Sequence, residues 1–207
     1  MAGCVRAFPT AFIILALGLT TGCKRNRDSP TLHAAGLEVG GKLESISSIE
    51  WVARQERGVV RLALAADGIP RLRRTLSALE STGTVAVAIE TAAMDCGVVR
   101  TGTAPGNAPM DFSAPVSLGL FPTKVVMFSR GRATVVRSSG RDWREITSRL
   151  DAEKDGSARD RQAVLVYGGD TVALPDLCSA IRSLQEAGRP EVFLVDDPSV
   201  RDDKLFQ

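Results

Sequence analysis

Apolar residues recur at two different periods along the first half of the chain. Period-two alternation predicts strands at 37–39, 59–65 and 85–89, and helical spacing predicts helices over 43–57 and 70–82. The apolar positions that carry these patterns are Ile46, Ile49, Val52, Ala53, Val60, Leu62, Leu64, Leu72, Leu76, Leu79, Val85, Val87 and Ile89. Alternating strands and amphipathic helices predict a small α/β unit in this half.

The second half continues with the same kinds of element. Residues 124–136 predict a hairpin, and 142–154 predict a helix. An apolar strand at 163–167, a helix over 174–187 and a final strand at 191–195 follow. The fold class expected for the chain is therefore α/β (α+β), with two small sheet-plus-helix lobes and the order β-β-α-β-α-β in the C-terminal lobe.

Two segments of the chain share the same spacing between a proline and a glycine, here called the Pro–Gly frame. Gly83 follows Pro70 by thirteen positions, and Gly188 follows Pro175 by the same number. Proline favours the first turn of a helix and glycine its end, and each helix lies between two predicted strands. We interpret the N-terminal lobe as a shortened repeat of the C-terminal one, with chance similarity between two βαβ units as the alternative.

The N-terminus has the features of an export signal. Residues 7–22 carry no charge, and this run is shorter than the about 20 apolar residues of a membrane-spanning helix. It ends in Leu19-Thr20-Thr21-Gly22-Cys23, which resembles the lipobox of bacterial lipoproteins. Residues 1–22 are thus predicted to be a signal peptide and Cys23 the lipid attachment site. The alternatives are an uncleaved anchor and an ordinary secretory signal.

Shifts in composition divide the chain into segments. Polar, charged and Pro-containing residues follow Cys23, which is typical of a tether. Gly, Pro, Thr and Asn are frequent over 101–115, which is typical of a linker. The expected organisation is signal peptide 1–22, tether 23–36, N-terminal lobe 37–100, linker 101–122, C-terminal lobe 123–196 and a loose polar tail 197–207.

Composition and charge exclude several classes of protein. The 207 residues have a net charge of only +2 and 5% aromatic residues, so the chain lacks the basic stripe and stacking platforms of a nucleic-acid binder. His33 is its only histidine, which argues against Cys/His and Ser/His catalysis and against a zinc site. No glycine-rich loop has the spacing of a phosphate cradle. We therefore expect no catalytic residues, no cofactor and no metal.

Several polar residues have either a structural or a functional interpretation. Asp170 lies in the turn after strand 163–167 and Asp67 in the corresponding turn of the first half, where aspartate is favoured for backbone reasons. Cys178 lies near Asp170 but lacks a base. For the acidic pairs and the helix arginines, solvated surface is the favoured interpretation over cation or anion binding. These residues are Asp196, Asp197, Asp202, Asp203, Arg71, Arg73 and Arg74.

Four cysteines remain to be assigned. Cys4 leaves with the predicted signal peptide, and Cys23 carries the lipid. Cys96 and Cys178 are then an even number in a compartment that permits disulfides. A bridge between them is one alternative. Two buried free thiols are the other, which the location of the two cysteines in different halves favours.

The C-terminal half resembles the periplasmic domain of the ExbD/TolR family of biopolymer-transport proteins. The stretch Ala163–Pro175 is similar to that family's strand, Asp-containing turn and entry into the last helix. The resemblance covers 124–195 and implies a module that dimerises or contacts envelope partners. Members of the family begin with a transmembrane helix that carries an aspartate. Residues 7–22 have no acidic residue, so the family's proton coupling does not carry over.

Together these observations predict a membrane-anchored periplasmic lipoprotein, a non-catalytic binding or accessory module of an ExbD/TolR-like transport or energy-transduction system. Its expected partners are the membrane, through the lipid on Cys23, and either a second copy of the chain or envelope transport proteins, but no nucleic acid. We expect binding through sheet edges at Val125–Phe128 and Val192–Val195. The alternative is an envelope lipoprotein with a glycan-binding or hydrolytic site that the sequence does not reveal.

Overall fold

The computed structural model of the chain describes residues 29–45, 59–104, 116–130, 132–137, 143–154, 156, 158–202 and 204. The predicted signal peptide, the lipid attachment site Cys23 and residues 46–57 of the predicted first helix lie outside these ranges.

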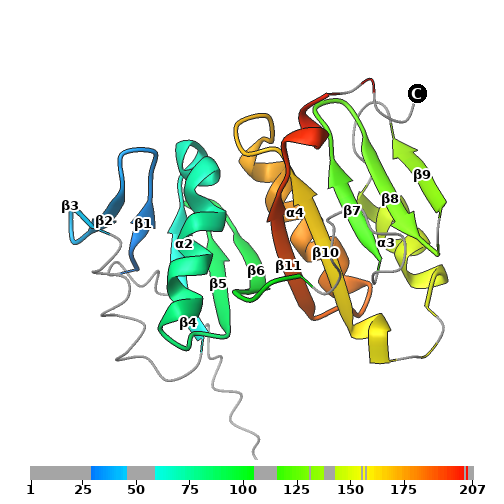
Figure 1. Cartoon of the computed structure of the whole chain (residues 1–207), viewed down its shortest axis with the longest axis horizontal. Helices are drawn as coiled ribbons and strands as arrows, with labels where there is room; N and C mark the ends of the chain where they lie inside the picture. The colour runs from blue at the N-terminus through cyan, green and yellow to red at the C-terminus, as the bar shows by residue number, and fades with distance from the viewer. Residues whose placement is uncertain are drawn as a thin grey trace, which may run out of the picture.

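The described residues form one mixed 11-stranded sheet with the order β3-β2-β1-β4-β5-β6-β11-β10-β7-β8-β9 (Figure 1). β4 pairs in parallel with β5, and β10 pairs in parallel with both β7 and β11. The strands are β1 Thr31–Leu32, β2 Leu37–Val39, β3 Lys42–Glu44, β4 Val59–Leu64, β5 Ala86–Glu90, β6 Asp95–Arg100, β7 Ser117–Leu120, β8 Val125–Ser129, β9 Arg132–Arg137, β10 Gln162–Tyr167 and β11 Glu191–Asp196. The two predicted lobes share this sheet, because β6 pairs in parallel with β11.

The described helices and the sheet enclose one continuous core. The α-helices are α2 Ile69–Ser81, α3 Trp143–Ala152 and α4 Leu174–Glu186, and the 3-10 turns are η1 Ala66–Gly68, η2 Ala158–Arg161 and η3 Pro198–Arg201. A row of buried residues in register crosses five strands: Val60, Val87, Val99, Val192 and Ala163. The buried stripes of α2, α3 and α4 pack into the same core as this row. The mixed α/β class expected from the sequence is confirmed.

A second, smaller core lies on the opposite face of the C-terminal strands. Alternate residues of β8 and β10 point away from the helices and meet the side chains of Phe121 and of Val200 in η3. The members of this core are Phe121, Val126, Phe128, Val164, Val166 and Val200. Strands 8 and 10 are therefore apolar on both faces, which is expected of strands that are covered on both sides.

The two repeated frames have the same local structure. β4-α2-β5 and β10-α4-β11 are both parallel βαβ units, and each helix has 13 residues with proline in its first turn. Gly83 and Gly188 follow these helices with φ of +83° and +75°, a conformation that glycine adopts without strain. The predicted strand–helix–strand order is thus present in both halves, and the duplication stays a hypothesis that these frames support.

Two predicted boundaries need correction at the N-terminal side. The predicted tether 23–36 includes Thr31–Leu32, which form β1 and pair with β2 and β4. Leu32 is buried, so the sheet begins inside that segment. The first residues of the predicted helix 43–57 form a strand instead, because Leu43 and Glu44 belong to β3 and pair with β2. Two residues are too few to show a period, and Leu43 fits the three-residue spacing that Ile46 and Ile49 continue, which favoured a helix.

Two further boundaries need correction in the second half. The predicted linker 101–122 contains β7, whose four residues are all buried. Gly119 lies inside this strand and lets two aromatic rings approach it, because a Cβ there would lie 3.0 Å from the ring of Phe121 and 3.2 Å from that of Phe128. The predicted loose tail 197–207 begins with η3, which buries Val200 against the second core.

Candidate interaction edge

The outer strands of the sheet differ from those that the sequence suggested. β8, which contains Val125–Phe128, lies between β7 and β9, and β11, which contains Val192–Val195, lies between β10 and β6. The prediction that these two strands form the edges is therefore wrong. The outermost described strands are β3 at one end and β9 at the other (Figure 1).

β9 is the longer of these two outer strands, with six residues against three in β3. Its partner is β8, where Phe128 lies opposite Ala133 and Val126 opposite Val135. Val135 is 44% exposed, and Arg132 and Ala133 are exposed as well. An outer strand has N–H and C=O groups that point away from its one neighbour, so it can pair with an extended segment of another chain.

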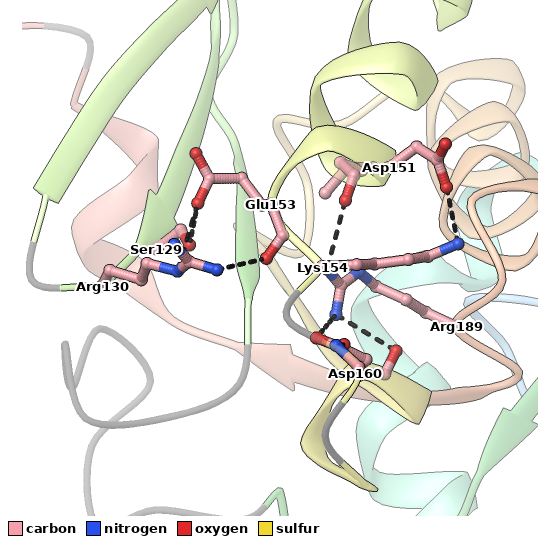
Figure 2. Close-up of polar contacts among 9 residues, drawn as sticks. Ser129, Arg130, Asp151, Glu153, Lys154, Asp160 and Arg189 are labelled. Atoms are coloured by element: carbon pink, nitrogen blue, oxygen red, sulfur yellow. Dashed lines mark hydrogen bonds and ion pairs between the residues drawn. The ribbon is translucent and has the colours of Figure 1, made fainter.

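The turn that leads into β9 is bound to the end of α3. Ser129 donates a hydrogen bond from Oγ to Oε2 of Glu153 over 2.9 Å, and Arg130 donates from Nη2 to the Glu153 carbonyl oxygen over 3.2 Å (Figure 2). Arg130 has a φ of +49°, which is uncommon for a residue other than glycine. These contacts hold the hairpin of the outer strand in one orientation.

A buried arginine, Arg189, also contacts the last turn of α3. Arg189 follows α4 and is 1% exposed. Its Nη1 donates to the carbonyl oxygen of Asp160 over 3.1 Å (Figure 2), and its Nη2 donates to that of Leu150 over 3.2 Å. The Asp160 carboxylate lies 3.8 Å from the same guanidinium. Nothing in the sequence marks this residue, because arginine is seldom fully buried.

An exposed ion pair lies beside this arginine, between Asp151 at the end of α3 and Lys154 just after it. Lys154 donates from Nζ to Oδ1 of Asp151 over 2.6 Å (Figure 2). The hydrogen bond and the positive charge of Lys154 lower the pKa of the Asp151 carboxyl below its ordinary value. Because the pair faces solvent, its contribution to stability is small.

Asp170 lies in the turn after β10, as predicted, and forms a surface ion pair. Its Oδ1 is 3.5 Å from Nε of Arg201, and its side chain is 68% exposed. The backbone of the same turn depends on a different carboxylate, because Gly169 donates its N–H to Oδ1 of Asp196 over 3.0 Å. Asp196 also lies 3.9 Å from Nη2 of Arg201. Arg201 thus lies between the two carboxylates.

The remaining acidic residues of this region bind nearby backbone amides. Asp197 accepts a hydrogen bond from the N–H of Ser199 over 2.8 Å and so caps η3. Asp202 accepts one from the N–H of Lys204 over 2.9 Å. Asp203 lies outside the described residues. The first two carboxylates therefore have backbone roles.

Asp67 and His33 come together on the N-terminal side. Nε2 of His33 is 3.2 Å from Glu38, and its Nδ1 is 3.4 Å from Asp67. His33 follows β1 directly, so it lies against the sheet and not in a tether. Asp67 in η1 and Asp170 after β10 thus have comparable places, each paired with a cationic or ionisable side chain.

The three arginines at the start of α2 have two kinds of environment. Arg73 is half-buried and donates from Nη1 to the carbonyl oxygen of Thr101 over 3.3 Å, which connects the helix to the end of β6. Arg71 and Arg74 are exposed. This is the solvated helix face that the sequence favoured, apart from the structural role of Arg73.

Cys96 and Cys178 form a disulfide, so of the two alternatives that the sequence left open the structure contains the bridge. Both residues are fully buried. Cys178 therefore has no free thiol, which removes the nucleophile that its proximity to Asp170 suggested.

Tyr167 is the single tyrosine of the chain and lies fully buried at the end of β10. Burial, and next the negative charge of Asp196, raise the pKa of its phenol above the ordinary value. The hydroxyl has no hydrogen-bond partner among the described residues. Sequence reasoning gave this residue no role, because a tyrosine in an apolar strand is typical of a core.

Among the described residues no helix is long and apolar enough to cross a membrane. The same residues contain no group of three or more histidine, cysteine or acidic side chains that could hold a metal ion. Comparison of the chain with protein-family models, curated proteins and solved structures finds no match.

Proposed function

We propose that this protein is a lipid-anchored component of the cell envelope that faces the periplasm and binds a partner chain without catalysis. The partner is a second copy or a component of an ExbD/TolR-like biopolymer-transport or energy-transduction system. The resemblance of residues 124–195 to the ExbD/TolR periplasmic domain motivates this system. The anchor is the lipid that the sequence 19–23 predicts on Cys23.

The observation that carries the binding role is the position of β9. It is the outermost strand on its side of the sheet among the described residues, and β8 is its one described neighbour. Val135 offers an exposed apolar side chain on it, and the contacts of Glu153 hold its hairpin to α3. A preformed strand loses little conformational entropy when a partner strand is added.

The disulfide supports the proposed compartment. Disulfides persist in oxidising compartments such as the bacterial periplasm and are rare in the cytosol. A buried bridge between Cys96 and Cys178 therefore fits a protein that is exported before it completes its fold.

A site-specific photo-crosslinker tests the binding strand in living cells. The crosslinking amino acid replaces Val135 in one variant and Val59 in the matched control. Val59 is 47% exposed and pairs with Ala86 of β5, and its strand β4 lies inside the sheet between β1 and β5. We expect Val135 to crosslink in the membrane fraction to a second copy of the chain or to an envelope transport protein, and Val59 to form no such product. Equal labelling from both positions, or none from Val135, would contradict the proposal.

Proline substitution tests whether main-chain groups carry the binding. Consecutive residues of a strand direct their N–H groups to opposite sides, so of Ala133 and Thr134 one faces β8 and the other faces outward. Ala133→Pro and Thr134→Pro, each combined with the crosslinker at position 135, therefore remove one internal and one outward donor. The variant that keeps the native circular dichroism should lose the crosslink, while alanine at the same position retains it. Retention of the crosslink in that folded proline variant would show that β9 does not bind by strand addition.

A further inference from the structure

The two halves of the sheet meet along a short seam between β6 and β11. In this seam Val99 pairs with Val192 and Arg100 with Phe193. The ladder between β10 and β11, by comparison, runs along both strands from Gln162 and Glu191 to Tyr167 and Asp196. Few main-chain bonds thus join the halves, and side chains must hold the seam closed.

A covalent bond crosses this seam. Cys96 belongs to β6 in the first half and Cys178 to α4 in the second, and their disulfide closes a loop with a sequence separation of 82. Close to it, Gln185 of α4 donates from Nε2 to the carbonyl oxygen of Val98 in β6 over 2.8 Å. The disulfide and this hydrogen bond both connect the strand of one half to the helix of the other.

A β-bulge directs Cys96 toward α4. Gly97 pairs with Ile89 and Asp95 pairs with Glu90, so Cys96 is an extra residue in β6. Gly97 has a φ of +108°, and a Cβ on it would overlap the side chain of Gln185. The bulge and the glycine thus allow the cysteine and the glutamine contact to lie on the same side of the strand.

We propose that the Cys96–Cys178 disulfide is an assembly lock that closes the seam between the halves once the chain is in an oxidising compartment. The two thiols lose two protons and two electrons to the disulfide of an oxidising protein, through a mixed disulfide, and that protein leaves as a dithiol. The proposal rests on the export part of the proposed function and not on binding at β9.

Before oxidation, each half retains the elements that fold locally. β4-α2-β5 and β10-α4-β11 each have parallel ladders of their own, whereas β6 depends on β5 and on the seam. The reduced chain is therefore a protein with two formed halves and an open seam. The bond favours the closed seam because it lowers the conformational entropy of the open state, in which the two halves are otherwise joined only through the long chain between the two cysteines.

Hydrogen exchange with mass spectrometry tests this inference on the full chain in detergent, oxidised or reduced and alkylated. Peptide mapping determines the redox state of Cys96 and Cys178 separately from that of Cys4 and Cys23. We expect the amides of 96–101 and 191–195 that face the seam, and not those bonded to β5 or β10, to exchange at least tenfold faster after reduction. Amides of β4 and of α4 should change less than twofold.

Two variants accompany the experiment. Cys96→Ala with Cys178→Ala should reproduce the reduced pattern without alkylation, and Gln185→Ala in the oxidised chain should leave seam exchange within twofold of the native rate. Unchanged exchange at the seam in the reduced chain and in the double variant would overturn the lock, because the seam then holds without it. Loss of protection in all strands would overturn it too, since the bond would then support the whole fold. Neither result depends on a crosslink at Val135, so failure of the lock and failure of the binding proposal are distinguishable.

Discussion

Arg189 donates a hydrogen bond to the carbonyl oxygen of Leu150, a residue 39 positions earlier in the chain. Leu150 lies in the last turn of α3, where carbonyl groups have no partner within the helix. The guanidinium satisfies one of these groups and, through its second contact with Asp160, also holds the turn η2. One buried cation thus joins α3, η2 and the start of β11.

Replacement of this arginine should destabilise the protein strongly. Arg189→Met keeps the apolar volume but leaves two carbonyl groups without their donor, so we expect the free energy of unfolding to fall by about 2–4 kcal/mol. Arg182→Met is the matched control, because Arg182 is exposed and lies 3.8 Å from Glu186. The control should change stability by at most about 0.5 kcal/mol. Urea denaturation measures both, and equal effects would contradict the role of Arg189.

Gly68 has a close contact that any larger residue would break. A Cβ on Gly68 would overlap the backbone carbonyl of Leu32 in β1. Gly68→Ala should therefore displace β1 and reduce the free energy of unfolding by about 1–3 kcal/mol. Gly102→Ala is the control, since its Cβ would meet only the Glu80 side chain at 3.6 Å. Thermal unfolding compares them, and a neutral Gly68→Ala would show that β1 adjusts freely.

The phenol of Tyr167 should resist ionisation while the protein is folded. Its pKa is raised in the folded state, so its contribution to stability is complete below the ordinary value of about 10 and is lost as the pH rises above it. Because this is the single tyrosine, tyrosinate absorbance reports it without overlap. We expect ionisation to coincide with alkaline unfolding. Titration near the ordinary pKa in a protein that stays folded would contradict the burial.

Removal of the same hydroxyl should cost little. The Tyr167 hydroxyl has no partner among the described residues, and Phe fills the same space without a polar atom. Tyr167→Phe should leave the free energy of unfolding unchanged or raise it, by up to about 1 kcal/mol. A chemical denaturation curve measures the change. A clear loss of stability would contradict this prediction.

The two carboxylates around Arg201 should differ in importance. Asp196 accepts the N–H of Gly169 and is partly buried, whereas Asp170 faces solvent. Asp196→Ala should therefore lower the free energy of unfolding by about 1–2 kcal/mol, and Asp170→Ala by at most about 0.5 kcal/mol. Both variants should keep the crosslink at Val135. A larger loss for Asp170→Ala than for Asp196→Ala in urea denaturation would contradict this prediction.

Local sequence pattern was enough to predict the helices and strands that have a clear apolar period or a Pro–Gly frame. β4, α2, β10 and α4 were predicted within one or two residues, because side-chain period and the Pro–Gly frames act over neighbouring positions. β6 and β7 were missed, since each contains a glycine, Gly97 or Gly119, a residue that is depleted in strands. In both strands the glycine accommodates a side chain from elsewhere in the fold.

Local sequence pattern predicts the α/β class and the two βαβ units. The order of the strands, the turn of Cys96 toward Cys178 and the burial of Arg189 are known from the three-dimensional structure alone. Strand order, bulges and buried polar contacts depend on hydrogen bonds between residues that are far apart in the sequence. Periodicity in one strand reports which face is apolar, but it contains no information about which neighbour that strand will have.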